Sequence, residues 1–391
     1  MKSVLPTYFK GDRIIWMVAF LLMIVSLLVV YSATGTLAYR FKEGNTTYYF
    51  LKQVMFLGVG FMIMYFTHMM PYSIFSKFGK VLLYAAIPLL LVTLLFGANL
   101  NQASRWLVIP GLGFTFQTSD LAKLALIMYV SRTLAQRQEQ IKDFKGTFLP
   151  LIAHIGVVCL LILPANFSTA ALLGLVCMLL LFIGRISVKH LAALSGIAIV
   201  VFALFILIAA NTSQGGRIGT WQARIERFLG SDEGGPGYQV EQGKIAVATG
   251  GIFGKGPGNS TQRNYLPHPY SDFIYAIIIE EYGIVGGVAV LFLYLFLLFR
   301  AGVIVRKSKR TFPAFLAVGL TLMLVFQALI NMAVAVNLFP VTGQPLPMVS
   351  MGGSSLLFTS LALGIILSVS RSMEEAANDK KIEEDGAKAN S

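Results

Sequence analysis

Charged side chains are scarce in this chain: they make up 13% of its 391 residues, whereas 56% of the residues are hydrophobic. A soluble globular domain carries about a quarter charged residues, so this composition excludes one. Uncharged apolar runs such as 14–31 have the length that an α-helix needs to cross a bilayer. The sequence therefore predicts an all-α polytopic membrane protein.

Cysteine and histidine are also rare. Cys159 and Cys177 both lie inside apolar runs, so they provide no disulfide for a loop and leave the redox compartment open. The four histidines show no paired metal-ligand spacing with cysteines or acids. No small-residue cleavage site follows the first apolar run, so we expect that run to be kept as a membrane span.

Ten apolar runs are bounded by charge, glycine or proline, which predicts ten transmembrane helices with both chain ends on one side. They cover residues 14–34, 49–69, 81–97, 118–136, 147–164, 168–184, 190–210, 272–299, 313–337 and 353–370. If the N-terminus is cytoplasmic, the inner segments hold 20 lysines and arginines and the outer segments hold ten. This asymmetry predicts an N-in/C-in topology, and it explains the net charge of +13 without a nucleic-acid partner.

Two long segments lie outside these spans of the predicted ten-helix domain, residues 1–371. A large extracytoplasmic loop, 211–271, joins helices 7 and 8, and a loop of this length is more often functional than filler. Its apolar residues at helical spacing, which favour a short helix on the membrane surface, are Trp221, Ile225 and Phe228. Residues 372–391 hold six acids and three lysines with few large apolar side chains, so we expect a flexible cytoplasmic tail.

Ionisable side chains at membrane depth are costly and usually functional. The acids at or inside a predicted span are Asp120, Asp272, Glu280 and Glu281. Asp272 follows a segment stiffened by Pro267 and Pro269 and directly precedes an apolar run. It could cap the helix N-terminus, where the dipole favours a carboxylate, or act as a general base facing an external cavity. The two roles are compatible.

The adjacent carboxylates Glu280 and Glu281 need protons or partners in apolar surroundings. On an ideal helix they point to opposite sides. Lys123 and Arg105 are the nearest cations by predicted depth, so one interpretation is a structural ion pair between helix 8 and helix 4. The other is a functional site.

Polar groups also flank helix 4 and helix 10. Arg105 can pair bidentately with phosphate oxygens, whereas Trp106 beside it equally fits an aromatic belt at the membrane interface. The segments 343–347 and 350–355 carry backbone groups that hydrocarbon cannot satisfy, so they must line protein or water.

Several motifs occur in order along the chain. They are Tyr31-Ser32-Ala33, Ser104-Arg105-Trp106, the run 117–123, the glycine-rich run 250–256, Asp272-Phe273-Ile274, Glu280-Glu281-Tyr282-Gly283, Pro345-Leu346-Pro347 and the run 350–355. This set resembles the SEDS family (shape, elongation, division and sporulation), which includes FtsW and RodA. The resemblance covers helices 1 to 10, and the segments 31–34 and 350–355 favour the division type, FtsW, over the elongation type, RodA.

The resemblance implies a peptidoglycan glycosyltransferase that polymerises lipid II into β-1,4 glycan strands on the outer face of the bacterial cytoplasmic (inner) membrane. The family's essential aspartate falls on Asp272. Undecaprenyl pyrophosphate would be the leaving group, so the site needs a base and cations, with room for a divalent ion, Mg²⁺ or Mn²⁺. Candidate pyrophosphate-binding residues are Arg105, Lys123, Arg224, Arg227, Lys244 and Lys255. Candidate structural or cavity residues are Trp106, Gln117, Ser119, Asp120, Glu280, Glu281, Pro347, Ser350, Gly352, Gly353 and Ser354.

The resemblance also implies a partner, a class B penicillin-binding protein with transpeptidase activity and one membrane helix, along with other divisome or elongasome proteins. Two other functions stay open: a lipid II flippase, and a scaffold that positions the transpeptidase without doing chemistry. Against a flippase, the ionisable candidates gather on the outer side, and helices 5 to 7 offer almost no charge. The chain departs from the family pattern at Thr118, Asp120, Asn166 and Met351, where the family has proline, glutamate, aspartate and tyrosine.

Overall fold

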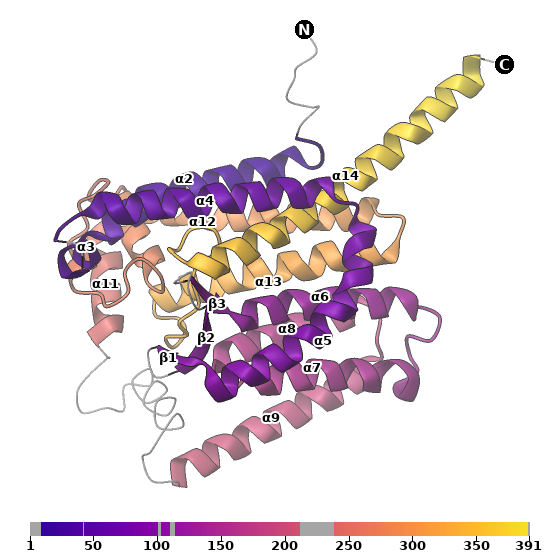
Figure 1. The fold of residues 1–391 in the computed structure, drawn as a ribbon, viewed down its shortest axis with the longest axis horizontal. Helices are drawn as coiled ribbons and strands as arrows, with labels where there is room; N and C mark the ends of the chain where they lie inside the picture. Colours follow the sequence, from indigo (N-terminus) through magenta and orange to yellow (C-terminus); the bar gives the residue numbers. More distant parts are fainter. Residues whose placement is uncertain (1–8, 42, 101–102, 110–113, 212–237, 390–391) are drawn as a thin grey trace.

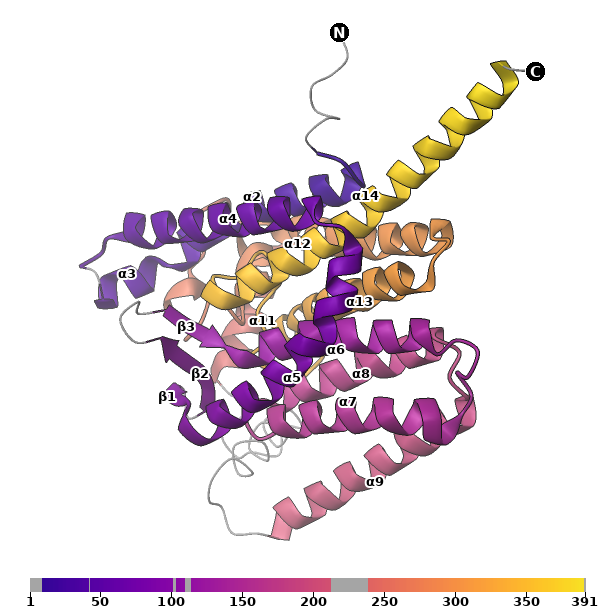
Figure 2. The same cartoon turned by 45° about the vertical axis from the view of Figure 1, so that its right-hand side comes forward.

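The computed structural model describes residues 9–41, 43–100, 103–109, 114–211 and 238–389. Over these residues the chain forms a bundle of long helices that run back and forth along one direction (Figure 1). A three-stranded sheet and the short helices α3 (Gly35–Phe41) and α11 (Tyr238–Gly250) lie at one end of the bundle. We call this the sheet end. The first and last described residues both lie toward the other end (Figures 1 and 2).

Within the described ranges, ten longer helices make up the bundle. They are α2 (Arg13–Ala33), α4 (Thr46–Met69), α5 (Tyr72–Phe96), α6 (Thr118–Gln136), α7 (Leu149–Ile162), α8 (Phe167–Ile183), α9 (Val188–Asn211), α12 (Ile274–Lys307), α13 (Thr311–Ala335) and α14 (Gly353–Ala389). A π-helical turn, Phe144–Phe148, leads into α7, and a 3₁₀ turn, Gln262–Asn264, lies in the segment before α12.

Each of the ten predicted runs overlaps one of these helices, and α6 has the predicted bounds. Within the described residues, seven helices are long and apolar enough to cross a membrane by length and composition: α2, α4, α5, α7 with its π-helical turn, α12, α13 and α14. The apolar helix α8 is shorter, 17 residues. The chain is therefore a multi-pass membrane protein, while the count of ten spans and their orientation stay predictions.

Burial separates the inner helices from the outer ones. In the most apolar windows of α13 and α14, 72% of the residues are buried, against 28% in those of α4, α5 and α12. Large apolar side chains such as Leu95 and Phe299 are exposed on the outer helices, as expected for surfaces that meet lipid. Helix α6 is also internal, and its run Leu124–Val130 is buried throughout. The core of the bundle is thus built from α6, α13 and α14.

The sheet was not predicted from the sequence. Strands β1 (Ala98–Leu100), β2 (Ala103–Ile109) and β3 (Phe114–Gln117) are antiparallel in the order β1-β2-β3. Trp106 of β2 is paired with Gln117 of β3, and α6 begins at the next residue. The last strand of the sheet is therefore followed directly by the N-terminus of α6.

Helix α12 is broken at Gly283, which has φ 70° and ψ −172°. This backbone conformation is open to glycine and strained for other residues. At the break, Lys255 N and Gly256 N donate to the carbonyls of Glu280 and Glu281, and Ile284 N donates to Gly251 O. The segment 251–256 therefore docks against the broken helix through backbone hydrogen bonds, so the predicted single span 272–299 is two helical pieces.

The C-terminal region continues the last helix of the bundle. Helix α14 continues through Ala389, so most of the expected flexible tail, 372–391, is helical, and it projects beyond the bundle (Figure 2). That this region moves separately from the bundle stays a prediction.

Candidate active site

Asp272 lies in a turn at the sheet end, just before α12. The helix begins at Ile274, and its N-cap residue is Phe273. Asp272 therefore precedes the cap position by one residue, and its predicted role as the N-cap is wrong. The side chain is half-buried, and Ser271 Oγ donates to its Oδ1 at 3.2 Å. The turn places the carboxylate outside the helix.

Three consecutive carbonyls of this turn are held by the segment between α13 and α14 or by α13 itself. Met351 N donates to Tyr270 O at 2.9 Å, and Ser350 Oγ donates to Ser271 O at 2.8 Å. Asn331 Nδ2 donates to the carbonyl of Asp272 at 3.0 Å. Since buried carbonyls need donors, these bonds fix the turn without using its side chains. The backbone that carries Asp272 is therefore anchored from one side.

The segment before α14 contains several predicted cavity residues, and further hydrogen bonds hold its backbone. Ser350 Oγ accepts from Leu346 N at 2.8 Å, and the buried Tyr294 hydroxyl donates to Pro347 O. Gln117 N donates to Ser354 Oγ at 3.3 Å. The structure thus brings this segment against the start of α6. Gly352 and Gly353 lead into α14 and are partly buried.

Asp120 and Lys123 form an ion pair at 2.8 Å on α6, with side chains 6% and 7% exposed. Lys123 also donates to Gln327 Oε1 at 3.4 Å. The predicted pairing of Lys123 with Glu280 or Glu281 is wrong, because its charge is balanced within its own helix. A cavity of about 10 Å³ adjoins the pair, lined among others by Gln327, Ser355 and Phe358.

Glu280 pairs with Lys255 at 2.7 Å, whereas the predicted partner Lys123 pairs with Asp120. Its carboxylate also accepts from Ser260 Oγ at 2.5 Å and from Thr261 N at 3.1 Å. The reason is that the segment 251–263 folds back onto α12. Its residues, and not those of α6, contact the Glu280 carboxylate. Glu280 thus forms an ion pair with the loop and not with α6, so the predicted ion pair between helix 8 and helix 4 is wrong.

Glu281 contacts the same loop. It accepts from Ser260 N at 3.2 Å and from Ser32 Oγ at the end of α2. Arg263 Nη1 donates to Ser32 Oγ at 2.9 Å. Glu280 and Glu281 thus both contact Ser260, contrary to the expectation that they face opposite sides. Sequence reasoning missed Ser260 and Arg263 as partners, and the only signal for Ser32 was its place in the Tyr31-Ser32-Ala33 motif.

The remaining candidate pyrophosphate-binding cations differ in whether their side chains are exposed, already paired or outside the described structure. Lys244 is exposed on α11, where it is open to an anion. Lys255 is already engaged with Glu280. Arg105 lies on β2 with its side chain outside what the structure describes, and Arg224 and Arg227 lie outside the described residues. Lys244 is thus the predicted cation with a described, exposed side chain.

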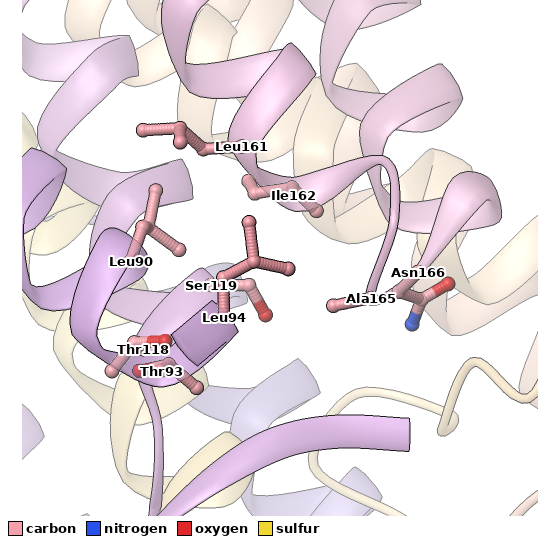
Figure 3. Close-up of a pocket in the computed structure, with 9 residues that line it drawn as sticks. All are labelled: Leu90, Thr93, Leu94, Thr118, Ser119, Leu161, Ile162, Ala165 and Asn166. Atoms are coloured by element: carbon pink, nitrogen blue, oxygen red, sulfur yellow. The ribbon is translucent and has the colours of Figure 1, made fainter. Parts of the chain in front are cut away.

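A small pocket lies between the start of α6 and the turn from α7 to α8. Figure 3 shows Thr118 and Ser119 on one side and Ala165 and Asn166 on the other. Asn166, which replaces the aspartate of the family pattern, caps α8, because its Oδ1 accepts from Thr169 N at 3.2 Å. The Ser119 hydroxyl accepts from Gln117 Nε2 at 3.0 Å. Asn166 thus caps the start of α8, and Ser119 contacts the residue that precedes α6.

Among the described residues, no group of three or more His, Cys, Asp or Glu side chains could hold a metal ion. The described part of the chain therefore offers no such set of ligands for a divalent cation.

The chain is similar to known proteins along nearly its whole length. It is 32% identical over 367 residues to stage V sporulation protein E of Bacillus subtilis, covering 92% of this chain and 97% of that protein. It is 34% identical over 374 residues to a probable peptidoglycan glycosyltransferase FtsW of a Geobacter species, covering 94% of this chain and 98% of that protein.

Solved structures share the fold at lower identity. One, described as structural coordination of polymerization and crosslinking by a peptidoglycan synthase complex, has a TM-score of 0.72 and 24% identity, covering 93% of this chain and 98% of that one. The rod shape determining protein RodA of Thermus thermophilus has a TM-score of 0.67 and 23% identity, covering 94% and 98%. Residues 12–375 match the family of cell cycle proteins named for FtsW, RodA and SpoVE, and the chain belongs to this family.

Proposed function

We propose that this protein is a peptidoglycan glycosyltransferase that polymerises lipid II into β-1,4 glycan strands. The relatives named as probable peptidoglycan glycosyltransferases FtsW support this activity. The observation that carries it is the half-buried Asp272, whose backbone is anchored by three consecutive carbonyl bonds. A fixed, partly accessible carboxylate is what general-base catalysis requires.

In the proposed reaction, Asp272 accepts the proton of the GlcNAc 4-hydroxyl of one lipid II. The hydroxyl oxygen bonds to the anomeric carbon of the MurNAc at the end of the growing strand, and the bond to undecaprenyl pyrophosphate breaks. The configuration inverts, and the pyrophosphate takes the electron pair. A cation near the leaving oxygens would stabilise this charge, and the exposed Lys244 is the described side chain that fits this role.

The site faces the outside of the cytoplasmic membrane in this proposal. The positive-inside asymmetry supports an orientation with the sheet end outside and the described chain ends inside. The partner would be a class B penicillin-binding protein, and the solved neighbour that coordinates polymerization and crosslinking supports this pairing. Relatives named FtsW support a role in cell division.

The test is polymerisation of lipid II by the purified protein with its transpeptidase partner. Wild type and the Glu241→Ala variant, which removes an exposed acid of α11 at the same end of the bundle, should make glycan strands. The Asp272→Ala variant should make none. A lipid II flippase would instead move lipid II across reconstituted vesicles without forming strands, and a scaffold would support growth equally well with Asp272→Ala.

A further inference from the structure

Two buried amide side chains lie one turn apart on the internal helix α13. Gln327 is 5% exposed and Asn331 is 1% exposed, within a helix whose other residues are mostly apolar. An amide in such surroundings is costly unless it forms hydrogen bonds. Their partners therefore indicate what these two residues do.

Both amides hold the backbone of the segment before α14. Gln327 Nε2 donates to Pro345 O at 2.9 Å, and Asn331 Nδ2 donates to Gln344 O at 2.8 Å. The spacing of four residues along α13 thus matches two consecutive carbonyls of this segment. The two amides therefore provide hydrogen-bond donors to an irregular backbone at membrane depth, where unpaired carbonyls are costly.

Asn331 reaches further, because the same Nδ2 also donates to the carbonyl of Asp272 at 3.0 Å. Gln327 reaches in the other direction, because its Oε1 accepts from Lys123, which is paired with Asp120. One face of α13 therefore connects Asp272 to the buried ion pair of α6 through two amides and two loop carbonyls.

We propose that Asn331 is a positioning residue for Asp272, and that Gln327 sets the register of the loop through which it acts. This inference rests on the proposed function, in which Asp272 is the base. Asn331 contributes two donor contacts to backbone oxygens, while its Oδ1 has no hydrogen-bond partner in the described structure. Asn331 therefore acts as a hydrogen-bond donor. It fixes the carbonyl of Asp272 and so orients the Asp272 carboxylate.

The first test replaces Asn331 with leucine, which is close in size and has no donor. A displacement of a catalytic group by about 1 Å can cost about 100-fold in rate. We therefore expect kcat for lipid II polymerisation to fall about 10- to 100-fold while KM stays within about twofold, the pattern of an interaction used in the transition state. Asn331→Ser, which keeps a hydroxyl donor, should retain more activity than Asn331→Leu, and it serves if the leucine variant does not fold.

The matched control is Thr321→Val on the same helix. Thr321 is fully buried, and its hydroxyl has no hydrogen-bond partner in the described structure, so the change removes a buried polar group without removing an anchor. Its kcat and KM should equal those of wild type. Equal kcat in Asn331→Leu and Thr321→Val would overturn the inference.

A double variant separates positioning from loss of stability. Ser350→Ala removes the donor to the neighbouring carbonyl of Ser271. If both residues act through the same turn, the double variant Asn331→Leu/Ser350→Ala should lose less kcat than the product of the two single losses. Strictly multiplicative losses, or losses that follow only the thermal denaturation midpoint, would contradict positioning. An active Asp272→Ala variant would instead reject the proposed function itself.

Discussion

Lys255 forms an ion pair with Glu280 at 2.7 Å, and the two residues lie on either side of Asp272 in the sequence. The Glu280 side chain is fully buried and that of Lys255 is 29% exposed. The pair therefore closes the segment 255–280, which contains the proposed base Asp272. The loop is therefore fastened to α12 both by this pair and by backbone bonds at the Gly283 break.

The Glu280→Gln variant should be strongly destabilised. Removing one partner of a buried ion pair costs about 3–5 kcal/mol, because the other partner loses its compensating charge. The partial exposure of Lys255 places the expected loss in unfolding free energy near the lower end, about 3 kcal/mol. Thermal denaturation of the detergent-purified protein measures it.

The double variant Glu280→Gln/Lys255→Met is the control for that measurement. It removes both charges, so it should recover part of the stability lost in Glu280→Gln. A double variant less stable than either single variant would show that the two charges do not stabilise each other.

Gly283→Ala should disrupt docking of the loop onto α12. Gly283 has a positive φ, and an added Cβ would meet the backbone of Ile252 and Gly254. A left-handed conformation costs a non-glycine residue about 1–3 kcal/mol before any clash is counted. We expect a lower denaturation midpoint and faster proteolysis within 251–263.

Gly302→Ala, on the same helix, is the control for this prediction. No atom lies within 4 Å of the Cβ that it would add. Its stability should stay unchanged or rise by up to about 1 kcal/mol, the difference in helix propensity. Equal stabilities of the two alanine variants would contradict the account of the break.

Lys244→Ala should weaken substrate binding without unfolding the protein. Lys244 is exposed on α11, so its loss disturbs little packing. A hydrogen bond to a charged group contributes about 1.5–3 kcal/mol, which corresponds to a fall in kcat/KM of about tenfold or more. Steady-state polymerisation kinetics with Glu241→Ala as control give the comparison, and an unchanged kcat/KM would exclude Lys244 from the pyrophosphate site.

Asn166→Ala should cost about 1 kcal/mol of stability, the usual loss when an N-cap is removed. Asn166→Asp, which restores the residue of the family pattern, keeps a side-chain oxygen for Thr169 N. Thermal denaturation should therefore rank Asn166→Asp above Asn166→Ala. The reverse order would mean that the cap is not the main contribution of this side chain.

The helices were predictable because their apolar runs are long and bounded by charge or glycine. The bounds 118–136 of α6 agree with the sequence, and the importance of the acids at membrane depth followed from their cost. The partners of Glu280 were not predictable. They depend on a helix break at Gly283 and on a loop that folds back, and neither leaves a periodic pattern.

Asn331 and Gln327 were missed for a different reason. Charge at membrane depth is the signal that marks functional residues in an apolar run, and neutral amides carry no charge. Their signal was nevertheless present as two polar residues four apart in an apolar run, a pattern that predicts hydrogen bonds on one helix face. The sheet of residues 98–117 was missed because its strands are short and lie between two predicted spans.

The central claim is that the carboxylate of Asp272 removes a proton in the polymerisation step. The direct measurement is the single-turnover rate of the Asp272→Asn variant with saturating lipid II, alongside its affinity for lipid II. The account predicts unchanged affinity and a rate lower by about 100-fold or more, since general-base catalysis contributes about 10²–10⁴-fold. A variant that binds lipid II and polymerises it at the wild-type rate would contradict it.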